Sequence, residues 1–237
     1  MAINNNRDRQ RTRVVYVPVN TGGGSGGGSQ EKIKVGESGL KFTNTTFTEI
    51  PEIFDFSDVT NLVDMFRNCF SLTTAPQMDT SQVAGMGSMF YYCTSLTSVP
   101  EMDTSKVTSM QSMFYNCESL ISIPEMNTSE VTNMETMFSG CKLLTTIPPI
   151  NTSRVTRIDF MFSRCNSLTD LGGFTGLKVN LDLSPCSKLS HESLLNVINK
   201  AADVTASPAT LTLGSTNLAK LSDEEKGIAT NKGWTLA

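Results

Sequence analysis

Six cysteines carry the most reactive side chains in this 237-residue chain. Five of them recur every 24 residues, at Cys69, Cys93, Cys117, Cys141 and Cys165. Closely spaced Cys-x-x-Cys pairs hold metal ions or exchange disulfides, but the chain has no such pair, and metal ligands do not recur at 24-residue intervals. We expect a column of small buried thiols, with disulfides between neighbours about 5 Å apart as the alternative. Cys186 breaks the interval.

The histidine gives little support for nucleophilic catalysis. His191 is the only histidine in the chain, and no acidic pair lies near it. Ser-His and Cys-His catalysis needs a base that a third group orients, so His191 lacks the necessary neighbours. We expect His191, which follows Ser190 at the predicted start of a helix, to lie in a capping neighbourhood. The sequence therefore predicts a protein that is not an enzyme and holds no cofactor or metal ion.

Acidic and amide side chains also recur every 24 residues, at Asp79, Asp103, Asn127 and Asn151. One interpretation is a ladder of calcium ligands. We favour helix capping and hydrogen bonding within turns, because these short side chains satisfy nearby backbone N–H groups without an ion. A glycine run, TGGGSGGGS in residues 21–29, precedes no lysine and opens no helix, so it is a flexible linker rather than a phosphate-binding loop.

A long repeat positions these residues. Written once, the unit is V-T-x-M-x-x-M-F-x-x-C-x-S-L-T-x-I-P-x-M-D-T-S-x, and its Met-Phe pair begins at residues 65, 89, 113, 137 and 161. The valine, leucine and proline columns keep the same 24-residue interval. A fixed period of this length without insertions indicates stacked units, each burying an apolar face against its neighbours.

Within one unit the spacing predicts a short helix and a short strand. Between Val107 and Cys117, five apolar residues fall at i, i+3, i+6, i+7 and i+10, as on one face of a helix. Residues 95–100 are β-branched and hydroxyl-rich and end at a proline, which suits a strand whose ladder stops there. The predicted fold class is an α/β repeat: a leucine-rich-repeat solenoid with strands on one face and helices on the other.

The composition divides the chain into five segments. We expect an N-terminal anchor peptide in residues 1–20, a Gly/Ser linker in 21–30, an N-terminal cap in 31–55, the 24-residue repeats in 56–170, and a C-terminal capping region in 171–237. In the last segment the pattern predicts strands at residues 181–184 and 211–214 and helices at 190–202 and 222–231. Such a terminal unit shields the last repeat from water.

The run VTSMQSMFYNCESLISIPEMNTSEVTNMETMF, residues 107–138, resembles the BspA-like leucine-rich repeats, which also occur in mycoplasma-type surface lipoproteins. The resemblance covers about residues 40–237 and rests on the Met-Phe, Cys and Pro spacing. It implies a scaffold for adhesion and recognition at cell surfaces, in Bacteroidetes and in the phages that infect them, and it implies no particular ligand. Surface adhesins of this kind normally carry an export signal, and we expect none here, because no apolar run follows the N-terminal arginines.

Residues that break the repeat pattern are candidates for binding, because packing does not dictate them. Tyr91 and Tyr115 occupy equivalent positions in adjacent units, and Tyr92 lies beside them. Tyrosine offers a large contact area at low entropic cost, so we expect these three residues to form a binding patch. The alternative is that neighbouring units half-cover them for structural reasons.

The predicted strand face is the second candidate binding surface. Its polar residues are Gln77, Thr97, Glu101, Ser122, Glu125 and Thr145. Solenoids often bind partners through this concave surface. Because the surface is polar and mildly acidic, it suits a sugar or a cationic partner and not DNA.

The N-terminal peptide combines a basic run with a β-prone run. The basic run contains Arg7, Arg9, Arg11 and Arg13, and the β-prone run contains Val15, Tyr16 and Val17. The whole chain has a formal charge of −4, but residues 1–30 carry a local +3. Followed by a flexible linker, this segment suits an anchor that docks on a larger assembly by adding a strand. Contact of the arginines with nucleic acid, or a terminus with no partner, are the alternatives.

Together these features predict a phage virion fibre or head-decoration protein, made in the host cytoplasm. Its expected partners are a capsid or tail protein at the N-terminus, a bacterial surface glycan or protein at the repeats, and further copies of itself in a homo-oligomer. We expect no nucleic-acid partner and no membrane span, since no segment approaches the ~20 apolar residues that a span requires. The alternative is a BspA-like adhesin or protein-interaction module on the bacterial cell surface.

Overall fold

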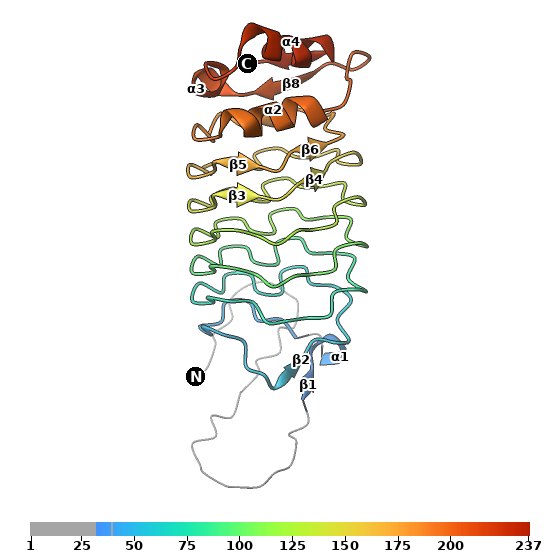
Figure 1. The fold of residues 1–237 in the computed structure, drawn as a ribbon. Helices are drawn as coiled ribbons and strands as arrows, with labels where there is room; N and C mark the ends of the chain where they lie inside the picture. Colours follow the sequence, from blue (N-terminus) through green and yellow to red (C-terminus); the bar gives the residue numbers. More distant parts are fainter. Residues whose placement is uncertain (1–31, 39) are drawn as a thin grey trace.

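The computed structural model describes residues 32–38 and 40–237 (Figure 1). The predicted anchor peptide and linker, including Arg7, Arg9, Arg11, Arg13, Val15, Tyr16 and Val17, lie outside the described residues. The rest of the chain winds into stacked turns, which we call coils, running from the blue N-terminal end to the red C-terminal end in Figure 1; the coils of the repeats are 24 residues long.

Regular secondary structure is sparse and gathers at the two ends of the stack. The strands are β1 (Ile33–Lys34), β2 (Phe54–Asp55), β3 (Thr146–Ile147), β4 (Ile150–Asn151), β5 (Asp170–Leu171), β6 (Phe174–Thr175), β7 (Leu181–Asp182), β8 (Ala209–Thr212) and β9 (Trp234–Leu236). The helices are α1 (Val35–Ser38), α2 (His191–Lys200), α3 (Gly214–Leu218) and α4 (Asp223–Asn231). All strand pairs are parallel: β1 with β2, β3 with β5, β4 with β6, and β8 with both β7 and β9.

Parallel bridges at the repeat interval hold the coils in register. One column of bridges joins Asn61, Gly85, Ser109, Asn133 and Arg157, each to the equivalent residue of the next coil. On another part of the coil, Thr74 bridges Ser98, and β3 pairs with β5 with Ile147 opposite Leu171. The 24-residue period of the sequence is therefore the spatial period of the structure.

The predicted helix in each repeat does not form, and this corrects the fold expected from the sequence. Residues 56–170 are all described and contain no helix. In their place runs a chain of tight turns in which Met89, Tyr91 and Cys93 each donate a backbone hydrogen bond to the carbonyl three residues earlier. The alternate N–H groups, those of Ser88 and Tyr92 among them, donate instead to the next coil.

The backbone angles explain why the turns cannot become helical. Ser88 and Tyr92 have φ angles of 53° and 58°, in the left-handed region, and the equivalent residues of other coils repeat this. Left-handed residues at every fourth position interrupt any right-handed helix. The apolar spacing predicts a helix all the same, because a chain of such turns buries the same residues as one helix face. Gly140, with φ 81°, holds the Tyr92 position in its coil, and a Cβ there would lie 1.8 Å from Asn116 Oδ1.

The predicted strand at the end of each repeat forms only in part. In the coil of residues 95–100, Ser98 makes a single bridge to Thr74. Two coils later the equivalent segment is the strand β3, which ends next to Pro148. Short strands and bridges at this position, rather than a continuous sheet of long strands, connect the coils.

Columns of like residues fill the core. Phe66, Phe90, Phe114, Phe138 and Phe162 stack with ring centroids 5.5–6.0 Å apart and nearly parallel planes. The valine, methionine, leucine and cysteine columns are buried beside them. The cysteine thiols repeat one contact, in which Cys93 Sγ donates to Phe66 O and Cys117 Sγ to Phe90 O, both at 3.1 Å.

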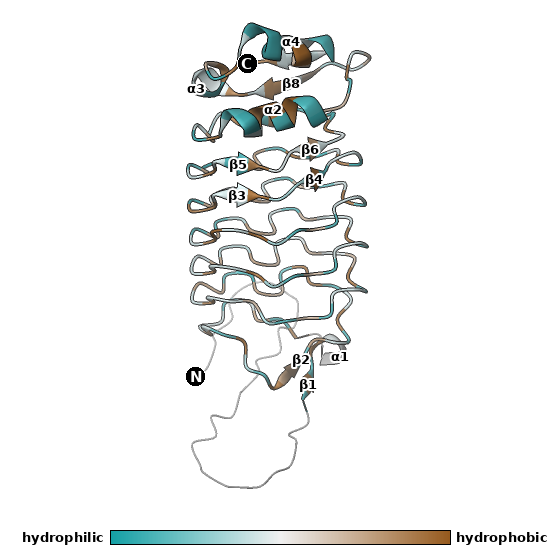
Figure 2. Cartoon of the chain, in the orientation of Figure 1, coloured by the Kyte–Doolittle hydropathy of each residue, from teal (hydrophilic) through white to brown (hydrophobic). Residues whose placement is uncertain are grey.

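The C-terminal region contains the predicted strands and helices. The expected strands correspond to β7 and β8, and the expected helices to α2 and α4. Helix α2 is capped by Ser190, whose side chain accepts a hydrogen bond from Ser193 N, and it buries Leu194, Val197 and Ile198. Figure 2 shows hydrophilic and hydrophobic residues alternating along α2 and α4 at the end of the stack. Helix α3 and strand β9 were not predicted.

Candidate functional site

The three tyrosines that break the repeat pattern lie together. The rings of Tyr91 and Tyr115 stack with centroids 4.9 Å apart and planes 9° from parallel. Tyr92 packs against both, at 4.9 Å from Tyr91 and 5.6 Å from Tyr115. We call Tyr91, Tyr92 and Tyr115 the tyrosine cluster; all three are half-buried. The stacking follows from the coil register, because each ring projects from the same position of its turn chain.

Arginine 67 extends the cluster into a third coil. Its guanidinium lies over the Tyr91 ring, 4.2 Å from the centroid, and also pairs with Asp64 at 3.1 Å. Guanidinium–ring contacts of this kind are favourable by about 0.5–1 kcal/mol at exposed sites. Both faces of Tyr91 are thus occupied, one by Arg67 and the other by Tyr115, so Tyr91 offers its edge and hydroxyl to a ligand.

In the described part of the chain, Tyr115 has no ring stacked on the side that faces the next coil. The equivalent residue of the next coil is Ser139, and among the described residues no ring or guanidinium stacks on that side of Tyr115. Burial raises the pKa of Tyr91, so its hydroxyl stays protonated at neutral pH and can donate a hydrogen bond. The cluster therefore presents half-buried rings with hydroxyl groups beside them, which suits contact with a sugar ring or a protein side chain.

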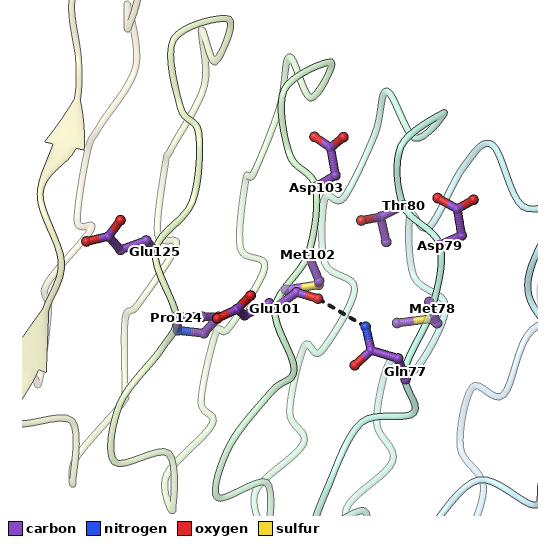
Figure 3. A pocket seen from close by; sticks show the side chains of 9 residues that line it. All are labelled: Gln77, Met78, Asp79, Thr80, Glu101, Met102, Asp103, Pro124 and Glu125. Carbon is purple, nitrogen blue, oxygen red and sulfur yellow. Dashed lines mark hydrogen bonds between the residues drawn. The ribbon is translucent and has the colours of Figure 1, made fainter.

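The predicted strand-face residues Gln77, Glu101 and Glu125 also come together. They line a hollow of about 520 Å³ that crosses three coils (Figure 3). We call this surface, formed by residues 77–80, 101–103 and 124–125, the acidic hollow. The tyrosine cluster does not line it, so the two predicted surfaces remain separate sites.

Sequence analysis did not assign three further polar residues of the acidic hollow to a binding surface. Asp79, Thr80 and Asp103 belong to the Asp-Thr-Ser segment that follows the strand position. Thr97 and Thr145, expected on the same face, instead donate their hydroxyls to Thr73 O and Ile121 O of the preceding coils. The recurrence of Asp or Asn before Thr was visible in the sequence, but the interpretation as capping removed these residues from consideration.

The recurring Asp and Asn side chains close turns and cap no helix. Asp79 Oδ1 and Asp103 Oδ1 accept hydrogen bonds from the N–H groups two residues on, at 3.0 and 2.9 Å. The Ser81 N–H chiefly lowers the pKa of Asp79, and the Ser105 hydroxyl and N–H lower that of Asp103. Both carboxyls are therefore ionised at neutral pH.

The cysteines, the remaining reactive side chains, are part of the core. All six cysteines are free and buried, and burial raises the pKa of Cys117, Cys141 and Cys186. Cys186, outside the 24-residue interval, is as buried as the others. Across residues 32–38 and 40–237, no His, Cys, Asp and Glu side chains gather in a group that could hold a metal ion.

His191 follows the cap residue Ser190 and connects two helices of the C-terminal region. Its Nε2 lies 2.9 Å from Glu225 Oε1, and Glu225 closes the capping box of α4 with Ser222. Its place beside Ser190 agrees with the capping neighbourhood expected from the sequence. Separately, none of the helices in the described part of the chain is long and apolar enough to cross a bilayer.

Comparison with known proteins supports the repeat interpretation. The stack is similar to the crystal structure of a leucine-rich repeat protein from T. pallidum, with a TM-score of 0.50 and 17% sequence identity over 83% of this chain and 86% of that one. This likeness shows a leucine-rich-repeat type of fold and no shared activity. No curated protein matches the sequence.

A family model matches the repeats themselves. The model described as "Mycoplasma protein of unknown function, DUF285" matches residues 39–145 and again residues 97–181. Together the two matches span more than half of the chain, and they cover the Met-Phe, Cys and Pro columns that set the coil register. The chain therefore belongs to the DUF285 family of repeat proteins.

Proposed function

We propose that this chain is a non-enzymatic binding protein: a phage virion fibre or head-decoration protein that presents a leucine-rich-repeat solenoid to the bacterial surface. The N-terminal peptide attaches it to a capsid or tail protein, and the repeats engage a surface glycan or protein. In this proposal the chain is made in the host cytoplasm and acts as a homo-oligomer on the particle.

The tyrosine cluster is the observation that carries the binding role. A repeat fold of this kind needs only its buried columns, and the equivalent positions in other coils are Arg67, Ser139 and Ser163. Three half-buried aromatic rings gathered on adjacent coils are not required by the stacking. Aromatic side chains on a rigid scaffold are typical of residues that dominate binding energies.

The attachment role is supported by the sequence alone. Four alternating arginines, a β-prone run and a Gly/Ser linker precede the repeats, in a layout that suits an anchor joined flexibly to a rigid body. The second candidate function is a BspA-like adhesin or protein-interaction module on a bacterial cell surface. The family match, whose description names mycoplasma proteins, favours this candidate as much as the first.

Labelling with antibodies against residues 40–237 separates the two candidates. Purified virions and intact cells of the producing strain are labelled with the same antibody and examined by electron microscopy. The virion proposal predicts label on particles, and label that is lost from particles assembled with a variant lacking residues 1–20. Label confined to the cell surface supports the adhesin instead, and label on neither contradicts both.

The binding role is tested with the tyrosine cluster. Because the Tyr115 ring contacts both other rings of the cluster, we expect Tyr115→Ala to weaken binding of the purified protein to host cells by about tenfold or more, as for a central aromatic contact. Ile121→Ala is the matched control, since Ile121 is an exposed apolar residue of the same coil, 52% exposed, outside the cluster. Equal binding by the wild-type protein and Tyr115→Ala, measured by flow cytometry, contradicts this role for the cluster.

A further inference from the structure

We infer that the acidic hollow is a binding site for an organic cation, a ligand that carries ammonium or guanidinium groups. This inference rests on the proposed binding role of the repeats and names a ligand class for a second surface. Four carboxylates line the hollow, from Asp79, Glu101, Asp103 and Glu125, and no lysine or arginine lines it. Figure 3 shows these side chains on three successive coils, with those of Asp79 and Asp103 pointing the same way.

The buried hydroxyl of Thr80 is stronger evidence for a ligand than the four carboxylates are. Thr80 is only 2% exposed, and its Oγ1 is the one buried side-chain nitrogen or oxygen in the described part of the chain that has no hydrogen-bond partner. Figure 3 shows this oxygen directed across the hollow toward the coil of Asp103. A buried polar group without a partner costs free energy and requires an explanation, for which a bound ligand is one.

The equivalent threonines of other coils show which hydrogen bond the Thr80 hydroxyl lacks. Thr104 and Thr128 donate to the backbone carbonyls of Asn127 and Asn151 in the next coil, at 2.9 and 3.0 Å. Thr152 does the same with Thr175 O at 3.1 Å. The equivalent acceptor for Thr80 is Asp103 O, and that bond is not made. The structure departs from its own repeat at the coil boundary where the hollow lies.

The backbone does not make up for the missing threonine bond. Within the described chain, no backbone–backbone hydrogen bond joins residues 76–80 to residues 100–104, and the same holds between 100–104 and 124–128 and between 124–128 and 148–152, where the threonine hydroxyls provide the links. At the equivalent position further along the stack, Ile150 N and Thr152 N donate to Gly173 O and Thr175 O, at 3.0 and 2.9 Å, and β4 pairs with β6. Among the described residues, the one hydrogen bond between residues 76–80 and 100–104 is a long bond of 3.5 Å from Gln77 Nε2 to Glu101 O.

The groups that face the hollow select for a cation with several donors. The four carboxylates, the Thr80 hydroxyl and the Gln77 carbonyl oxygen can all accept hydrogen bonds. Glu101 and Glu125 make no ion pair within the described chain, and the nearby Lys106 ammonium binds Gln82 Oε1 at 2.8 Å. Met78 and Met102 are buried beneath, where they can contact the methylene groups of a ligand.

The geometry favours an elongated organic cation over a metal ion. No group of three acidic side chains in the described residues converges as metal ligands do. The carboxylates instead recur from coil to coil, at a spacing of about 5 Å that follows from parallel pairing. A chain of ammonium or guanidinium groups, from a polyamine or from the basic side chains of a peptide, matches this linear array.

Isothermal titration calorimetry of the full chain with two probes at low ionic strength tests the inference. The probes are spermidine and a capped Arg-Ala-Arg peptide, which separate the two sources of cationic groups. We expect binding of at least one probe, weakened about two- to fivefold by Glu101→Gln and by Glu125→Gln, as each exposed ion pair is lost. Glu118→Gln, which removes a carboxylate paired with Lys142 away from the hollow, is the control and leaves binding unchanged.

Thr80→Val separates a ligand role from a structural one. Since the hydroxyl has no partner in the protein, its removal leaves the melting temperature equal or higher, while binding of the cation falls about tenfold. Thr128→Val is the matched variant two coils along. It loses hydrogen bonds with both Asn151 O and Asn151 N, so it lowers the melting temperature by about 2–4 °C and leaves binding intact.

Three outcomes overturn the inference. They are binding of neither probe, equal binding by wild type and Thr80→Val, and calcium binding that is tighter than probe binding and lost in the Glu101→Gln variant. The proposed function is judged separately by cell binding of the same proteins. Loss of probe binding with normal cell binding refutes the cation site alone, whereas loss of cell binding in Tyr115→Ala with normal probe binding concerns the tyrosine cluster alone.

Discussion

The repeats and the C-terminal region bury similar columns of apolar residues but build them in different ways. In residues 56–170 alternate N–H groups of each turn chain donate to carbonyls of the next coil, the others close tight turns, and little of the chain forms a helix or strand. In residues 171–237 helices α2 and α4, each with its own serine cap, add local hydrogen bonds to contacts between segments about 30 residues apart, such as the pairing of β7 with β8. The repeats thus rely on hydrogen bonds between neighbouring coils, whereas the C-terminal region adds hydrogen bonds within single helices.

The difference implies that damage spreads differently in the two regions. A coil held by its neighbours transmits a defect to them, because each turn chain donates to the next coil. An element held by its own caps and one packed face contains the defect. Three sets of substitutions, in decreasing order of the change that we expect, test this contrast.

Removing one ring from the phenylalanine column is expected to have the largest effect. Phe114 is fully buried and stacks on Phe90 and Phe138 at 5.6 and 5.7 Å. Phe114→Ala is expected to cost about 3–5 kcal/mol in the free energy of unfolding, the usual range for a buried aromatic residue. Hydrogen exchange should show lost protection in the coils on both sides. Trp234→Ala in β9 is the comparison, and its loss of protection should stay within the C-terminal region; equal spread in both variants would remove the contrast.

The C-terminal region depends on a fully buried amide that donates to three backbone carbonyls. Asn217 is fully buried, and its Nδ2 donates to Leu183 O, Cys186 O and Leu213 O at 3.1–3.3 Å. Asn217→Ala leaves buried carbonyls without a donor, so we expect a loss of about 1–3 kcal/mol in chemical denaturation. Asn199→Ala, on the exposed side of α2, should be nearly neutral. A neutral Asn217→Ala would show that water replaces the amide.

The smallest effect concerns the Asx turns, which the two regions share. Asp103 and Asp203 both accept a backbone N–H two residues on, at 2.9 Å, and hydrogen bonding lowers the pKa of each carboxyl. A lowered pKa in the folded state gives stability that is present above the unfolded pKa of about 3.9 and is lost as the pH falls below it.

Replacing either aspartate with asparagine should preserve the turn and remove this pH dependence. Asn127 already occupies the Asp103 position in the next coil and accepts the same N–H at 3.1 Å. We expect Asp103→Asn and Asp203→Asn to flatten the acid limb of melting temperature against pH by a similar small amount. An unchanged acid limb in both variants would show that the turns contribute no pH dependence.

The repeat register is predictable from the sequence because identical residues recur at one interval. Identical residues at a fixed interval indicate that each occupies the same environment in its own coil. Sequence analysis predicted α2 and α4 because Ser190 and Ser222 are cap residues followed by amphipathic turns. It failed on the helix within each repeat, since spacing reveals which residues are buried and not the sign of φ. Ser88, Tyr92 and Thr136 adopt positive φ angles, although their residue types rarely do so.

The tyrosine cluster was predicted from the sequence, whereas the role of Thr80 in the acidic hollow was not. The tyrosines stood out because they break the pattern, and coil register then placed them together. Thr80 did not stand out, because it fits the pattern fully. Its difference from Thr104 and Thr128 lies in an unmade hydrogen bond to the next coil, which depends on how far two coils separate. No single-residue property encodes that separation.

Coil register at a constant interval has an evolutionary consequence. Because each coil meets its neighbours through the same set of bonds, in-frame duplication or loss of one whole repeat would join two interfaces that already fit each other. Recombination between copies could therefore lengthen or shorten the molecule while leaving both end regions intact. Related genes should then differ in length by multiples of one repeat, so that selection can vary how far the protein reaches without redesigning its fold.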